Sequence, residues 1–227
     1  MAQIYGPHIV TDGLILSLDA ASVNSYPGSG TTWYDMSGYG NNATLYNSPT
    51  WNSAGYFTFD GTNDYAGITF NSATMAAWAL GQTIIVWEYH SFNDGSRRNI
   101  WNQAYAGYGT WTHEGGYNIN YFWGDGGGDS SPYTSINSST TPINVWNMLV
   151  TSRDASNAYW YVNGVNTSSG ANPYAELTAT TANISIGIGY TGTYWVGNMA
   201  VIMAYNRALT SAEILQNYNA QKSRFLR

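Results

Sequence analysis

Cysteine is absent from the 227 residues of this chain, which excludes disulfide bonds and thiolate chemistry. Charged residues make up only 9%, against about 25% in a typical soluble domain. Seven Lys and Arg face thirteen Asp and Glu, and the formal net charge is −6, so we expect no basic surface for nucleic acid. No apolar run approaches the ~20 residues that a membrane-spanning helix needs, so we expect no membrane insertion.

The N-terminal sequence MAQIYGPHIVTDG has no Lys or Arg before an apolar segment, and we therefore expect no signal peptide. Residues 1–12 are expected to form an extended arm, because Pro7 disfavours a helix and supplies no backbone N–H. Such an arm could dock against another subunit.

Aromatic residues are plentiful: they make up 16% of the chain, with 10 Trp and 20 Tyr, a composition that argues against disorder. Short runs with strand patterns recur between Gly, Asn, Ser and Pro. The predicted strands are residues 14–20, 56–60, 65–70, 83–90, 98–103, 117–123, 146–153, 158–163, 182–189 and 197–206. Ten short strands with no helix between them predict an all-β fold, a two-sheet antiparallel sandwich of the jelly-roll type.

The pair Asn163-Gly164 stands between two of these runs. It predicts a two-residue hairpin, because a type I′ turn needs positive φ at both central positions.

A C-terminal helix is predicted from Thr210 onward. Glu213 stands three residues after Thr210 and completes a capping box. Ile214, Leu215 and Tyr218 then form an apolar face at helical spacing. We expect residues 208–227 to pack on the sandwich as a helix and tail; the alternative is a docking peptide for a partner.

Four motifs occur in an order typical of one superfamily: FTFDGTNDY (57–65), WNMLVTSRDASNAYWYVNGV (146–165), ISIGIG (184–189) and GNMAVIMAYNRALTSAEI (197–214). Together they resemble the concanavalin A-like, laminin-G-like jelly-roll superfamily. The opening segment, residues 13–45, resembles the version found in structural proteins of tailed phages, notably marine ones. The resemblance implies a laminin-G-like domain over residues 13–207.

The resemblance also bears on Arg207 in the motif YNRAL. A guanidinium among apolar residues needs carboxylate or carbonyl partners. We expect Arg207 to form a partly buried ion pair, with Asp60 and Asp35 as the candidate partners.

Catalytic constellations are not evident in the sequence. Glycoside hydrolysis needs two carboxylates about 5–9.5 Å apart, yet Glu88, Glu114 and Glu176 each lack an acidic residue two positions away along a strand. Glu88 and His90 share one strand face and are expected to form a hydrogen-bonded pair. No nucleophile motif accompanies the three histidines, so we expect no enzyme.

Calcium is the one cofactor that the resemblance leaves open, because several members of the superfamily hold Ca²⁺ at the sandwich rim. Oxygen ligands suit this hard cation. Asp60 and Asp64, in the turn DGTND, are the candidate ligands, although Asp and Gly are also ordinary turn formers.

Exposed aromatic rings are candidates for ligand or partner binding. The segment 91–135 is rich in Tyr and Trp, and most of these rings should be core. We expect Tyr105, Tyr108 and Trp111 to lie in loops and to be exposed, where they could stack on sugars or contact a protein partner.

The function expected from these observations is that of a non-enzymatic phage virion protein, a capsid decoration, fibre or tail component. Its partners would be other virion proteins, and it could form a homo-oligomer. The alternative is a lectin-like adhesion module that binds cell-surface glycans.

Overall fold

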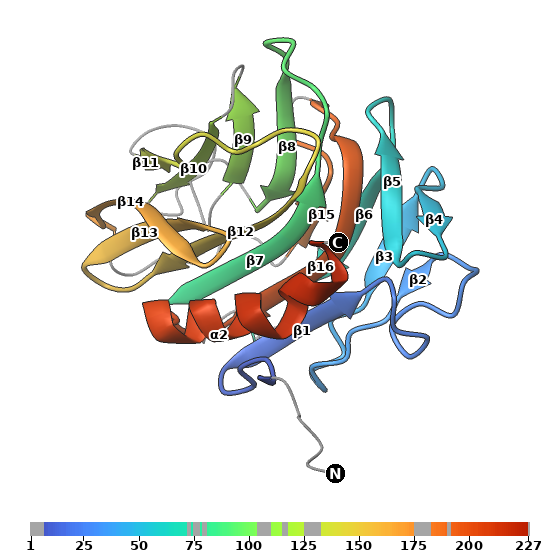
Figure 1. The fold of residues 1–227 in the computed structure, drawn as a ribbon, viewed down its shortest axis with the longest axis horizontal. Coiled ribbons are helices and arrows are strands. Elements are labelled where there is room, and N and C mark those ends of the chain that lie inside the picture. Colours follow the sequence, from blue (N-terminus) through green and yellow to red (C-terminus); the bar gives the residue numbers. More distant parts are fainter. Residues whose placement is uncertain are drawn as a thin grey trace.

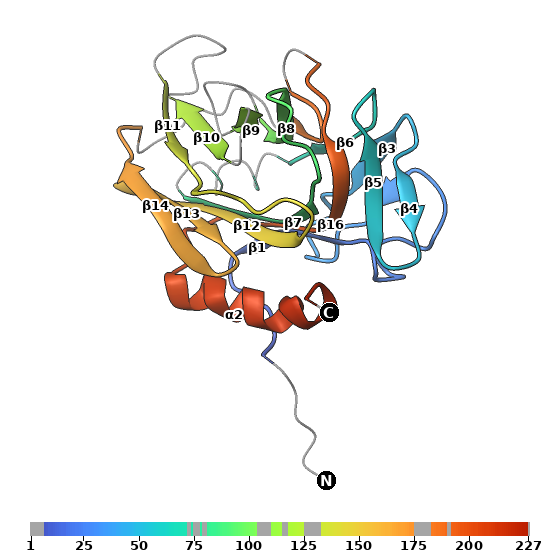
Figure 2. The ribbon, with the colours of Figure 1, turned by 45° about the horizontal axis from the view of Figure 1, so that its top comes forward.

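The computed structural model describes residues 7–71, 74, 78, 81–103, 110–114, 118–124, 133–174, 183–189 and 192–226. Two antiparallel sheets form a sandwich, and helix α2 lies across the outer face of one of them (Figure 1). Figure 2 shows the two layers, with α2 outside the lower one. The predicted antiparallel sandwich with one short C-terminal helix is confirmed.

The first sheet, sheet A, contains eight strands. In spatial order these are β14 (Val165–Ala171), β13 (Asn157–Val162), β12 (Trp146–Arg153), β7 (Gln82–Tyr89), β16 (Val196–Tyr205), β5 (Tyr56–Asp60) and β4 (Thr50–Asn52). The eighth strand, β1 (Leu14–Asp19), pairs with the second half of β16, beyond the part that pairs with β5.

The second sheet, sheet B, also contains eight strands. In spatial order these are β11 (Tyr133–Asn137), β10 (Ile119–Gly124), β9 (Thr110–Glu114), β8 (Arg97–Asn102), β15 (Asn183–Ile186), β6 (Tyr65–Thr69), β3 (Ala43–Tyr46) and β2 (Thr32–Trp33).

Each of the ten predicted strands coincides with an observed strand to within a few residues at its ends. The strands that the sequence did not indicate are β2, β3, β4, β9, β11 and β14. Most of these are short or polar: β4 has three residues, and β14 has no buried side chain. A strand without a buried apolar row lacks the alternation by which strands are recognised.

The central strands of sheet A are buried on both faces, in agreement with their continuous apolar runs. Ile84 and Val86 of β7 point into the core between the sheets. Ile85 and Trp87 alternate with them and belong to a second apolar cluster on the outer face of the sheet. Helix α2 therefore covers a hydrophobic sheet face that would otherwise contact water.

Helix α2 (Ser211–Gln221) begins with the predicted capping box and continues into a 3₁₀ turn, η2 (Lys222–Arg224). It packs on Trp87, whose ring stacks on the rings of Tyr218 and Phe225. The predicted packing role is confirmed for this helix. None of the helices in the described part of the chain is long and apolar enough to cross a lipid bilayer.

One position of the predicted apolar helix face is wrong. Leu215 is 45% exposed, whereas Ile214 and the polar Asn217 are buried. Asn217 faces inward because its side chain binds two polar groups of the interior: Oδ1 accepts from the Val10 N–H (2.8 Å), and Nδ2 donates to the Tyr205 hydroxyl (3.1 Å).

The expected N-terminal arm packs on its own chain from residue 8 onward. Val10 is buried, its carbonyl accepts a hydrogen bond from the Tyr205 hydroxyl (2.9 Å), and the His8 carbonyl accepts from Gln216 (2.8 Å). Residues 1–6 lie outside the described residues. Any role of the arm in contacting another subunit stays a prediction.

Candidate functional site

A groove of about 520 Å³ lies on the outer face of sheet B, over β3, β6 and β15. The strand pleat points alternate side chains of these strands outward. Most of the lining residues are outward ones, whereas Ile68 and Ile184 belong to the core. The lining residues are Gly40, Asn42, Thr44, Tyr46, Tyr65, Gly67, Ile68, Thr69, Asn183, Ile184 and Ser185. None of these lining residues carries a charge.

Two tyrosines form one wall of the groove. Tyr46 and Tyr65 are direct partners across the β3–β6 pair, and their rings stack with centroids 4.5 Å apart and planes 9° from parallel. Tyr46 is 42% exposed. Burial, followed by the neighbouring Tyr46 and Tyr194, raises the pKa of Tyr65, so its hydroxyl stays neutral and able to donate a hydrogen bond.

Gly67 lines the groove beside these rings and has no side chain to fill it. It pairs with Thr44 of β3 on one side and with Ser185 of β15 on the other. A Cβ at this position would lie 3.1 Å from Cε2 of Tyr46. Any larger residue would therefore have to push the Tyr46 ring away from its stacked position.

Hydrogen-bonding groups form the other side of the groove. The Thr69 hydroxyl donates to the Asn183 side-chain oxygen (2.9 Å) across the β6–β15 pair. This bond fixes the Asn183 amide at the edge of the groove. Thr44 and Ser185 add hydroxyl groups, so aromatic faces and neutral polar groups stand side by side.

The groove suits a neutral, polar ligand with apolar faces. Aromatic rings attract weakly positive C–H groups through their π faces, and hydroxyl and amide groups exchange hydrogen bonds with hydroxyl-rich ligands. No pair of carboxylates lines the groove, so the two-acid chemistry of glycoside hydrolysis has no basis there.

Comparison with known proteins identifies the family of this chain. The family described as "Concanavalin A-like lectin/glucanases superfamily" matches residues 60–215. The chain belongs to this superfamily. Comparison with curated protein sequences gives no match.

Solved structures with the same fold include receptor-binding domains of botulinum neurotoxins. The C/D mosaic domain is 18% identical with a TM-score of 0.74, and the match covers 93% of this chain and 52% of that one. The serotype D domain, solved in complex with N-acetylneuraminic acid, is 17% identical with a TM-score of 0.74 and the same coverage.

A third relative is the DC binding domain in complex with SialylT, at 15% identity and a TM-score of 0.69, covering 92% of this chain and 52% of that one. The chain spans about half the length of these toxin domains. At such low identities, the likeness between this chain and the toxin domains shows a shared fold alone.

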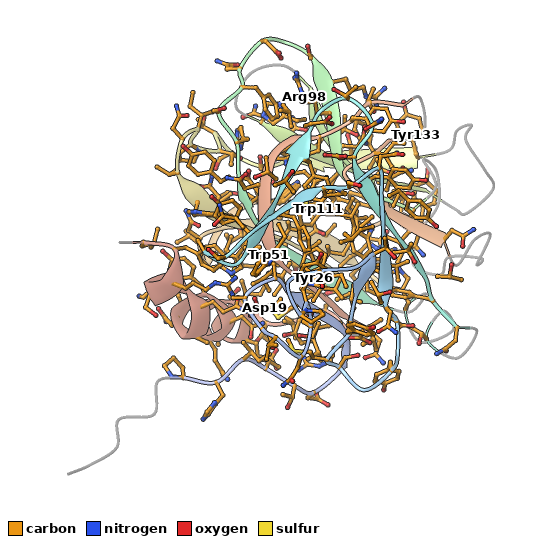
Figure 3. All side chains as sticks on the ribbon, turned by 90° about the vertical axis from the view of Figure 1, so that its right-hand side faces the viewer. Asp19, Tyr26, Trp51, Arg98, Trp111 and Tyr133 are labelled. Atoms are coloured by element: carbon orange, nitrogen blue, oxygen red, sulfur yellow. The ribbon has the colours of Figure 1, made fainter. Side chains whose placement is uncertain are left out.

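Of the three aromatic residues predicted to bind a ligand, only Trp111 belongs to the described residues, and it does not line this groove. Trp111 lies in β9, is 0% exposed, and donates its indole N–H to the Thr151 hydroxyl (3.1 Å) across the core. Figure 3 places it in the interior of the sandwich. Its predicted exposure is wrong because the residue lies in a strand, β9, rather than in a loop, and the pleat of that strand turns it inward. Tyr105 and Tyr108 lie outside the described residues.

The predicted calcium ligands belong to a turn. The Asp60 carboxylate accepts the backbone N–H groups of Thr62 (2.7 Å) and Asn63 (3.3 Å), and the Thr62 bond contributes most to lowering its pKa. The buried Asp64 carboxylate accepts the Asp60 N–H (3.1 Å), and burial raises its pKa. In the described part of the chain, no three His, Cys, Asp or Glu side chains converge on a possible metal position.

Arg207 forms an ion pair as predicted, but its partners are not the predicted ones. Its guanidinium contacts both Glu213 oxygens (2.6 and 3.1 Å) and Asp12 (3.0 Å). The prediction that Asp60 or Asp35 would pair with it is wrong, because the start of α2 and the N-terminal segment lie beside residue 207. Asp35 instead accepts backbone N–H groups of Ser17 (2.8 Å) and of its own loop.

Two further sequence predictions are confirmed. Asn163 and Gly164 both have positive φ, 53° and 83°, and join β13 to β14 as a hairpin. Glu88 and His90 form a fully buried pair with 2.7 Å between Oε2 and Nδ1.

Sequence reasoning missed Tyr46 and Tyr65 as site residues. The strand-like alternation around Tyr65 shows which residues share a face. It does not show that β3, rather than another strand, pairs with β6 and brings Tyr46 beside Tyr65.

Proposed function

We propose that this protein is a non-enzymatic carbohydrate-binding domain whose binding site is the groove beside Tyr46 and Tyr65. The observation that carries the proposal is a stacked, partly exposed tyrosine pair that borders an uncharged polar groove on an open sheet face. Membership of a superfamily named for lectins and glucanases supports it, as does one structure of the same fold solved in complex with N-acetylneuraminic acid.

The ligand that fits is a short, neutral oligosaccharide. A volume of about 520 Å³ falls within the range of about 300–1,000 Å³ typical of small-ligand sites. One sugar face would stack on the Tyr46 ring, while its hydroxyl groups bind Asn183, Thr44 and Ser185. A charged glycan would find no counter-charge among the lining residues.

A glycan array with the purified chain tests this proposal. We expect Tyr46→Ala to weaken binding about two- to tenfold, because loss of one aromatic contact costs about 0.5–1.5 kcal/mol. The matched control is Tyr133→Ala, since Tyr133 is also 42% exposed but lies on β11, the far edge of sheet B. Equal binding by Tyr46→Ala and the unmodified chain, at equal melting temperature, would refute the groove as the site.

Calcium is tested in the same experiment by adding a chelator. We expect binding to be unchanged, because the Asp60 and Asp64 carboxylates already accept backbone N–H groups of their turn. Loss of binding on chelation, restored by Ca²⁺, would instead make these two aspartates the residues to substitute.

We further propose that the domain is displayed on a phage particle, as capsid decoration, fibre or tail component. The observation that favours this role is the resemblance of residues 13–45 to structural proteins of tailed phages. Virion display would bring the groove to cell-surface glycans.

Incorporation into particles tests the virion proposal. A shortened chain that tests the N-terminal arm should lack residues 1–6 and keep Pro7 and all later residues. Val10 and Asp12 must stay because Val10 contacts α2 and Asp12 forms an ion pair with Arg207. We expect the chain in purified particles, detected by mass spectrometry, and loss of it when residues 1–6 are deleted. Particles that never contain the chain would refute the virion role and leave the glycan proposal standing.

A further inference from the structure

Arg153 is a buried guanidinium without a carboxylate partner in the described part of the chain. It is the last residue of β12 and is 1% exposed. Thr151, two residues earlier, accepts the Trp111 indole N–H inside the sandwich, so the pleat also turns Arg153 toward the space between the sheets.

Two nitrogens of this guanidinium are left without a hydrogen bond among the described residues. Nη1 donates to the Tyr174 carbonyl (3.3 Å), whereas Nε and Nη2 have no hydrogen-bond partner among the described residues. The Nε–Nη2 edge presents two parallel N–H groups, the geometry that binds both oxygens of one carboxylate.

A further free donor lies beside it. Gln82 is the register partner of Arg153 across the β7–β12 pair and is 1% exposed. Its Oε1 accepts the Tyr121 hydroxyl (3.1 Å), while its Nε2 has no partner in the described part of the structure. Burial raises the pKa of Tyr121, and the nearby Arg153 guanidinium opposes that rise, which places the three side chains together.

The acidic residues that the structure describes are engaged elsewhere. Asp154, the nearest in sequence, directly follows the end of β12, and its carboxylate accepts the Ser156 and Asn157 N–H groups (2.7 and 2.8 Å) of its own turn. A buried cation without an anion is costly. The cluster therefore offers positive charge and three N–H donors at the end of the sandwich where β7 begins and β12 ends.

We propose that Arg153, Gln82 and Tyr121 form a binding site for a small carboxylate-bearing ligand. The Nε–Nη2 edge of Arg153 binds the two carboxylate oxygens, and the Gln82 amide donates to one of them. The Tyr121 hydroxyl holds the Gln82 carbonyl so that the amide faces the ligand. This site is separate from the tyrosine groove and does not depend on it.

The test measures the melting temperature of the full chain with sodium acetate and sodium glucuronate, against sodium chloride and glucose at matched ionic strength. A ligand that binds only the folded state raises the melting temperature. We expect a rise with a carboxylate and none with chloride or glucose. A rise with acetate identifies the carboxylate group alone as ligand, and a rise with glucuronate only identifies an acidic sugar.

Three variants test which residues cause the rise in melting temperature with a carboxylate. Arg153→Met should weaken carboxylate binding at least about tenfold, because a charge-assisted hydrogen bond is lost. Gln82→Glu should place a carboxylate beside the guanidinium, raise the ligand-free melting temperature and abolish the response. Arg97→Met removes an arginine from the opposite end of the sandwich and should respond as the unmodified chain does.

Two outcomes would overturn the proposal. One is the absence of a carboxylate response in the unmodified chain, and the other is an equal response in Arg153→Met. The Tyr46→Ala variant should keep the full carboxylate response, so failure of the groove proposal and failure of this one give different results.

Discussion

Several buried polar residues lie close together at one end of the core. Glu88 binds His90 through one carboxylate oxygen and accepts the Asn147 amide through the other (3.1 Å). The His113 ring lies edge-on to His90 with centroids 5.2 Å apart, and neither His113 nitrogen has a hydrogen-bond partner among the described residues. Protonating His113 would therefore bury an unpaired charge.

The pH dependence of stability should report this histidine. Burial, followed by the electrostatic effects of His90 and Arg98, lowers the pKa of His113 from 6.5 to about 4, and only Asp94 acts the other way. Between these values the unfolded chain takes up the proton first, so His113 makes stability fall as pH drops from about 6.5 to 4. The slope is at most about 1.4 kcal/mol per pH unit.

Urea unfolding at several pH values measures this slope. We expect His113→Phe to flatten it, whereas His8→Phe, at an exposed position, should leave it unchanged. An unaltered slope in His113→Phe would contradict the assignment.

Among the elements, the β13–β14 hairpin is joined to α2 through its turn. A Cβ at Gly164 would lie 3.1 Å from Leu215 Cδ1 and 3.2 Å from Tyr218 Cβ. The partly exposed Leu215 thus covers the turn, while its neighbour Ile214 is buried against the sheet. The helix is held at its flank by the hairpin as well as from below by Trp87.

Substitution of Gly164 should lower the free energy of unfolding by more than the strain of its left-handed backbone alone. Gly164→Ala loses about 1–2 kcal/mol from the left-handed backbone and more from the contact with α2. Gly95→Ala is the matched control, because Gly95 also has positive φ but no atom within 4 Å of the added Cβ. Chemical denaturation of both variants measures the difference, and equal losses would mean that the helix contact contributes nothing.

In the whole molecule, Arg207 joins parts that are distant in sequence. It follows β16 and binds Asp12 of the N-terminal segment and Glu213 of the capping box at the start of α2. Arg207 is the largest cause of the lowered pKa of Glu213, about 2 instead of 4.5.

Arg207→Met should lower the free energy of unfolding by about 1–2 kcal/mol at neutral pH, more than a typical surface ion pair, because the helix cap loosens too. The contribution is fully present above about pH 4.5 and is lost as pH falls toward 2, where Glu213 takes up its proton. Arg98→Met, which removes the exposed pair with Asp94, should cost less. Thermal unfolding of both compares them; an unchanged melting temperature in Arg207→Met would contradict this role.

Local signals in the sequence determined much of the fold. The strands 56–60 and 146–153 have the predicted bounds, because alternation or continuous apolar character is a property of each segment alone. The Asn163-Gly164 turn and the Thr210–Glu213 cap were equally readable, since both depend on residues within a few positions of each other.

Neighbours across the sheets were decided only by the tertiary structure. The stacking of Tyr46 on Tyr65 needs β3 beside β6, and the pairing of Arg207 with Glu213 rather than Asp60 needs α2 folded back beside the end of β16. The inward direction of Trp111 required knowing that its segment is a strand of sheet B. The sequence by itself therefore determined the elements and their turns, whereas the sites arise from contacts between residues that no local pattern links.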